Sequence, residues 1–148
     1  MKISSALVKA IDDLIEKNND AYNGFLKAKE KAKSMDLRTY LRSQADRRKD
    51  FAAKLAAEQK EMDSDEQSFE EGSVKGKIHR SWISFRSNFD DDKAILEECI
   101  RGDKACIKEY KNVWKEHRDM PPNLTAVLSK QVAEIEQTQN TIKTLEDL

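Results

Sequence analysis

Residues 91–116 read DDKAILEECIRGDKACIKEYKNVWKE, and this stretch contains both features that decide the fold. Its apolar residues recur three or four positions apart, the spacing of one face of an α-helix. The acidic residues at its start suit a helix N-terminus, where a cap and the helix dipole both favour negative charge. The stretch therefore predicts an amphipathic helix, and its apolar face consists of Ile95, Leu96, Cys99, Ile100, Cys106, Ile107, Tyr110, Val113 and Trp114.

Three other long segments have the same periodicity, at about 5–33, 37–62 and 122–148. Only a short break separates the first from the second, and Pro121-Pro122 separates the third from the fourth. Short breaks make antiparallel neighbours, whereas the long crossover over 63–92 joins two hairpins in the ferritin-like order. The sequence predicts an all-α, antiparallel, ferritin-like four-helix bundle. A short extra helix is expected in the crossover at about 74–89, with Trp82 buried against the bundle.

Composition limits the classes of function. The chain has 148 residues, which fits a single domain over 1–148. Its formal net charge is −1, so no basic face for nucleic acid is expected. Because no apolar run is long enough for a membrane span and no signal peptide is evident, we expect a cytoplasmic protein with no membrane contact. The exposed faces show no second apolar stripe, which favours a monomer or weak homodimer; a protein partner is not readable.

A set of polar residues interrupts the apolar faces. At 100° per residue, they fall within or beside the inward arc of their helices. Three of them lie near helix midpoints, and Gln44 is about a turn away. A polar group in a core costs free energy unless it is hydrogen-bonded, so these positions predict a shared central network. Its members are Asn18, Gln44, Arg48, Asp103, Gln131 and Glu134.

This level of the bundle is where ferritin-like proteins build a two-metal carboxylate site from Glu and Glu-x-x-His. Neither His79 nor His117 follows a carboxylate by three positions, so that motif is absent. Two interpretations of the layer stay open. Asp103 pairs with Arg48 or Arg47, or else the acids and amides hold a divalent cation through oxygen ligands. No other cofactor is expected.

The two cysteines, Cys99 and Cys106, lie seven residues apart on one predicted helix. Their Cα atoms would be roughly 10 Å apart, too far for a disulfide. We therefore expect two reduced, buried thiols and a reducing compartment. Thiol chemistry is the weakest functional hypothesis because no histidine lies opposite to activate either sulfur.

Several stretches resemble a family of small bacterial proteins. They are HRSWISF (79–85), DDKAILEECIRGDKA (91–105), Pro121-Pro122 and IKTLEDL (142–148). The family is placed in the ferritin-like superfamily and described as a domain of unknown function. The resemblance implies a ferritin-like bundle, a bacterial cytoplasmic origin and an acidic residue after the Arg-Gly pair, here Asp103. It implies no activity.

Two functions are therefore expected. One is a non-catalytic structural, interaction or stress-related role. The alternative is binding of iron or another divalent cation at a reduced carboxylate-amide centre.

Overall fold

The computed structural model of the chain describes residues 4–62 and 91–148. Four long helices make up most of this part: α1 (Ser5–Lys31), α2 (Met35–Met62), α3 (Asp92–Glu116) and α4 (Pro122–Thr141). A single 3-10 turn, η2 (Leu145–Asp147), follows near the C-terminus. No strand occurs in the described ranges. The all-α four-helix prediction is therefore confirmed.

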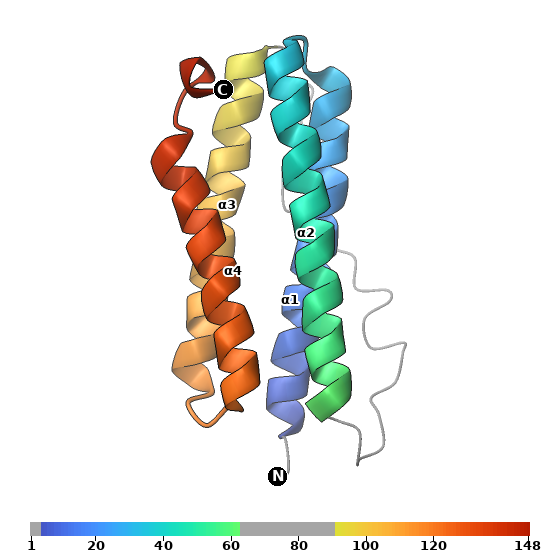
Figure 1. Cartoon of the computed structure of the whole chain (residues 1–148), viewed down its shortest axis with the longest axis vertical. Helices are drawn as coiled ribbons and strands as arrows, with labels where there is room; N and C mark the ends of the chain where they lie inside the picture. The colour runs from blue at the N-terminus through green and yellow to red at the C-terminus, as the bar shows by residue number, and fades with distance from the viewer. Residues whose placement is uncertain (1–3, 63–90) are drawn as a thin grey trace.

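The four helices form two antiparallel hairpins that lie side by side (Figure 1). α1 packs on α2, α3 packs on α4, and across the hairpins α1 meets α3 and α2 meets α4. Figure 1 shows α2 and α3 running in the same direction, so each helix is antiparallel to both of its packing neighbours. The end of α2 and the start of α3 consequently lie at opposite ends of the bundle.

Local contacts hold the start of α1, the α1–α2 turn and the start of α3. The Ser4 hydroxyl accepts a hydrogen bond from Leu7 N at 3.1 Å and caps α1. At the α1–α2 turn, Arg38 Nη1 donates to two carbonyls at the end of α1, Lys29 O and Ala32 O. The carboxylate of Asp92 then accepts from the backbone of that turn, so the start of α3 is tied to the first hairpin; its donors are Lys33 N at 2.9 Å and Ser34 N at 2.8 Å.

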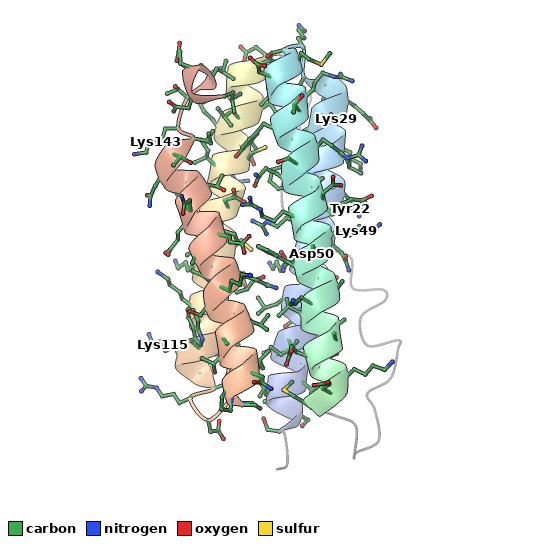
Figure 2. The ribbon with its side chains drawn as sticks, viewed as in Figure 1. Tyr22, Lys29, Lys49, Asp50, Lys115 and Lys143 are labelled. Carbon is green, nitrogen blue, oxygen red and sulfur yellow. The ribbon has the colours of Figure 1, made fainter. Side chains whose placement is uncertain are left out.

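The core runs the length of the bundle between the helices. Each fully buried Leu, Ile or Phe stabilises the fold by roughly 1.5–3 kcal/mol relative to an exposed one. The largest apolar side chains with almost no exposure are Phe25, Ile11, Leu14, Leu37, Leu41, Leu55, Ile95, Leu124 and Leu128. At the edge of the core, the partly buried Tyr22 ring lies beside Lys49 on the α1–α2 hairpin, with Lys49 Nζ 5.1 Å from the ring centroid (Figure 2).

The structure differs from the sequence prediction in the last helix. We expected it to continue to about residue 148, but α4 ends at Thr141 and Ile142 is extended. Asp147 explains the stop, because its carboxylate accepts from Lys143 N at 2.8 Å and Thr144 N at 3.0 Å. This capping box starts η2 instead of prolonging α4. The expected crossover helix at 74–89, with Trp82, lies outside the described residues.

Candidate functional site

Arg48 lies at the centre of the bundle with only 1% of its surface exposed. Its Nη2 donates to Asp103 Oδ1 at 2.6 Å, forming an ion pair between α2 and α3. Its Nη1 donates to Asn18 Oδ1 at 3.0 Å and to Cys106 Sγ at 3.3 Å. A charged, hydrogen-bonded pair of this kind is short and strong, so the guanidinium joins α1, α2 and α3 at one point.

The hydrogen bonds continue from Arg48 around the bundle. Asn18 Nδ2 donates to the Tyr110 hydroxyl at 2.8 Å, and that hydroxyl donates to Gln131 Oε1 at 2.6 Å. Gln131 Nε2 then donates to the carbonyl of Phe51 at 3.3 Å, one turn from Arg48 on α2. The path visits α2, α1, α3 and α4 and returns to α2. We call Arg48, Asn18, Tyr110, Gln131 and the Phe51 carbonyl the polar ring.

Every donor in the polar ring points the same way around it. Bonds aligned in this manner polarise one another and strengthen in a low-dielectric interior. Asn18 Nδ2 also donates to Leu14 O at 2.9 Å, which satisfies its second hydrogen. The buried side chains of the ring are thus bonded to each other and to the backbone.

Burial controls the protonation of the groups beside the ring. Loss of hydration raises the pKa of Asp103 to about 6, although the Arg48 guanidinium lowers it in part. At pH 7 the carboxyl is therefore mostly ionised and paired. Burial also raises the pKa of the Tyr110 hydroxyl, which remains protonated and able to donate to Gln131.

Both cysteines are free and buried, as expected. Burial raises the pKa of Cys99 and Cys106 above the usual thiol value, and for Cys106 the nearby Arg48 opposes this only in part. The reactive form of cysteine is the thiolate. These two sulfurs are accordingly poor nucleophiles, and Cys106 serves as a hydrogen-bond acceptor for Arg48.

The structure brings together four of the six residues that the sequence placed in the central layer: Asn18, Arg48, Asp103 and Gln131. Gln44 is buried, with 6% exposure, but within the described residues it makes no hydrogen bond to them. Glu134 was expected near the edge of the arc, and its side chain is 37% exposed. It faces Arg47 at 3.7 Å, outside the polar ring, and Arg47 Nη1 also donates to Thr138 Oγ1 at 3.2 Å.

Sequence reasoning missed two parts of the buried polar structure. Tyr110 was counted as an apolar core residue, yet its hydroxyl links α1 to α4 through the polar ring. The only available signal was that a buried tyrosine hydroxyl usually finds a partner. Nearer the bundle end, Gln59 Nε2 donates to Asp12 Oδ1 at 2.9 Å, forming a second buried polar contact between α2 and α1.

The carboxylate of Asp103 belongs to no cluster of metal-ligating side chains in the described residues. Within residues 4–62 and 91–148, no three side chains of His, Cys, Asp or Glu lie close enough to hold a metal ion together. The positive charge beside Asp103 is instead the guanidinium of Arg48. A divalent cation bound there would face the guanidinium at short range, which opposes binding.

Fold and site together define an all-helical bundle whose central polar groups are bonded to one another. The model of a protein family described as a domain of unknown function (DUF2383) matches residues 6–116, from α1 to the end of α3. The chain therefore belongs to this family, and α4 lies beyond the matched region. No curated protein and no solved structure matches the chain. Every helix in the described residues is too short or too polar to cross a lipid bilayer.

Proposed function

We propose that this protein is a non-catalytic four-helix bundle with a structural or interaction role, including a role under stress. The observation that carries the proposal is the position of Arg48. Its guanidinium takes the central place and bonds to Asp103, Asn18 and Cys106. These potential ligands are thereby engaged by a permanent cation of the chain itself.

We also propose that the bundle is ferritin-like, bacterial and cytoplasmic. The parallel course of α2 and α3 supports the ferritin-like relation, because it requires the one long crossover of that class (Figure 1). Two free, buried thiols agree with a reducing compartment. Only Met35 and Leu145 are exposed large apolar residues in the described part, which supports a monomer or weak homodimer.

Metal analysis tests this proposal against the metal-binding alternative. The protein is purified without a histidine tag, and its bound metals are measured by elemental analysis. We expect no stoichiometric iron, manganese or zinc, and no rise in melting temperature when these ions are added. Asp103→Ala and Asp103→Leu should change the melting temperature, whereas their metal content and their response to added ions should be the same as in the wild type.

The two variants separate a structural carboxylate from a ligand. Asp103→Ala leaves Arg48 buried without its anion, whereas Asp103→Leu fills the space with apolar atoms and should cost less. Stoichiometric metal in the wild type that both variants lose, together with metal-dependent melting, would overturn the proposal in favour of a carboxylate-amide metal centre.

A further inference from the structure

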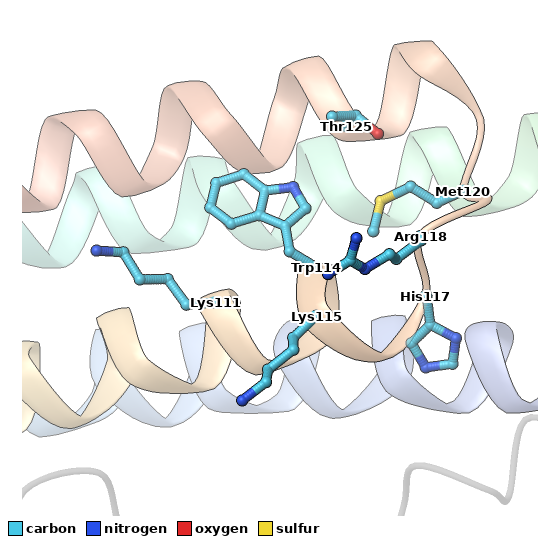
Figure 3. A pocket seen from close by; sticks show the side chains of 7 residues that line it. All are labelled: Lys111, Trp114, Lys115, His117, Arg118, Met120 and Thr125. Atoms are coloured by element: carbon cyan, nitrogen blue, oxygen red, sulfur yellow. The ribbon is translucent and has the colours of Figure 1, made fainter.

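A pocket of about 420 Å³ opens at the turn between α3 and α4 (Figure 3). Three of its lining residues have basic side chains: Lys111, Lys115 and Arg118. Apolar atoms come from Trp114 and Met120. No acidic residue lines the pocket, although acids slightly outnumber Lys and Arg in the whole chain, where the net charge is −1.

Internal pairing accounts for only part of this positive charge. Lys111 Nζ lies 3.1 Å from Glu136 Oε2 across the α3–α4 contact. Lys115 is in the last turn of α3, where the helix dipole favours a cation. Arg118 follows the helix end and makes no ion pair within the described residues. The pocket therefore has at least one cation that pairs with no carboxylate of residues 4–62 or 91–148.

The apolar part of the pocket is preformed. Met120 is 8% exposed, and Trp114 is partly buried against the core. Figure 3 shows the Trp114 ring across the space between α3 and α4, with Arg118 and Met120 on its nitrogen-bearing side. Within the described part of the chain, the indole N–H makes no hydrogen bond. Trp and Arg in a pocket are the residue types that most often anchor protein contacts.

We propose that this pocket binds an acidic peptide segment of a partner protein. The carboxylates of the segment pair with Arg118 and Lys115, and an apolar side chain between them covers Trp114. Figure 3 shows the Lys115 and Arg118 side chains extending in different directions from the end of α3, which suits successive carboxylates along a peptide better than one small anion. The inference rests on the proposed interaction role and gives it a site.

Other classes of ligand fit less well. Duplex nucleic acid requires a broad basic face, whereas the chain as a whole is slightly acidic. Helices that bind a membrane surface usually combine exposed apolar side chains with basic ones. The exposed large apolar residues of the described part, Met35 and Leu145, do not line this pocket.

The test is a titration with a synthetic peptide, EEDFEDE, followed through Trp114 fluorescence in a Trp82→Phe background. The full chain is used, because nothing shows that one hairpin folds alone. A matched peptide with amides in place of the acids, QQNFQNQ, is the ligand control. Residues 63–71 of the chain contain five acidic residues and could compete with the peptide for the pocket. A variant with Asn or Gln in place of these five residues controls for that competition.

Two charge-reversed proteins locate the binding. Lys115→Glu/Arg118→Glu changes the pocket, and Lys104→Glu/Lys130→Glu changes exposed lysines on the same two helices that do not line it. We expect saturable binding of the acidic peptide that the first pair of substitutions weakens at least about tenfold and the second less than about twofold. Salt at roughly 0.5 M should weaken it too, through screening.

The proposal is overturned by no saturable response to the acidic peptide, by equal binding of the amide peptide, or by equal losses in the two charge-reversed proteins. Binding to phosphatidylserine vesicles without binding to the peptide also overturns it, in favour of a membrane surface. None of these results bears on bound metal, so a failure here is distinguishable from a failure of the non-catalytic bundle proposal.

Discussion

Arg48 and Arg118 show how one residue type behaves in two regions of the bundle. Arg48 is 1% exposed and bonded to Asp103, Asn18 and Cys106, so its charge is used within the fold. Arg118 lies at an open pocket and has no carboxylate partner in the described residues. A buried charge must be matched, whereas an exposed charge can stay in water until a ligand arrives. The centre should therefore respond to substitution through stability, and the α3–α4 end through binding.

The largest effect is expected from Arg48→Met. This change leaves the Asp103 carboxylate buried without its counter-charge and removes a donor to Asn18, so it should cost about 3–5 kcal/mol of the free energy of unfolding. Urea denaturation at pH 7 measures it. Arg42→Ala is the matched control, since Arg42 pairs with Asp46 on the exposed face of the same helix and should cost less than about 0.5 kcal/mol. Similar losses in the two variants would contradict a special role for the centre.

A pH effect of about 1–3 kcal/mol is expected from Asp103. Burial raises its pKa from 3.8 to about 6, so between these values the folded state binds more protons than the unfolded state. This carboxyl therefore stabilises the fold at low pH, and the contribution is lost as pH rises through about 6. Asp103→Asn cannot titrate. The stability of wild type relative to this variant should rise as pH falls from 7 to 4, and a flat difference would show that Asp103 has an ordinary pKa.

Tyr110→Phe should cost roughly 1–2 kcal/mol, because removal of the hydroxyl leaves Gln131 Oε1 without its donor and interrupts the polar ring. Thermal and urea unfolding measure the change. Tyr22→Phe is the control: the Tyr22 ring is only partly buried and its hydroxyl makes no hydrogen bond within the described residues, so removal of the hydroxyl should be nearly neutral. If both substitutions are neutral, the ring contributes no net stability.

The smallest stability change is expected at the pocket. Lys115→Gln/Arg118→Gln removes two exposed charges without leaving a buried group unpaired, so the free energy of unfolding should change by less than about 0.5 kcal/mol. A loss of several kcal/mol would show instead that these cations hold the α3–α4 turn together, and would make the pocket a structural feature.

Helical periodicity was sufficient to predict the helices and the inward direction of most central polar residues. Asn18, Arg48, Asp103 and Gln131 were found from their angles alone, because a helix fixes the direction of each side chain within one turn. The angle says nothing of which group a side chain reaches. Gln44 points inward yet makes no bond to the polar ring. Tyr110 was taken for an apolar residue because its aromatic group is apolar, although its hydroxyl belongs to the polar ring.

The end of α4 and the pocket were beyond such reasoning. Ile142 and Leu145 continue the apolar spacing, so the pattern could not reveal that the Asp147 carboxylate stops the helix at Thr141 through backbone contacts. The pocket depends on how the turn after Glu116 places Arg118 and Met120 beside Trp114. Turn geometry and side-chain conformers decide that placement, and the periodicity of apolar residues carries no information about either of them.

The polar ring also bears on the handedness of the bundle. Two topologies of opposite hand are available to a bundle of two hairpins. In the second topology α4 lies against α1 and α3 lies against α2. A core made only of Leu, Ile and Ala distinguishes weakly between them, because apolar contacts are not directional. The hydrogen bonds distinguish the two forms, because they run from α2 through α1, α3 and α4 in that order. In the exchanged form the two bonds of the polar ring between the hairpins, from Asn18 Nδ2 to the Tyr110 hydroxyl and from Gln131 Nε2 to the Phe51 carbonyl, would be broken inside a dry core. The mirror-related topology is thereby disfavoured by unsatisfied polar groups, a discrimination that apolar packing alone does not make.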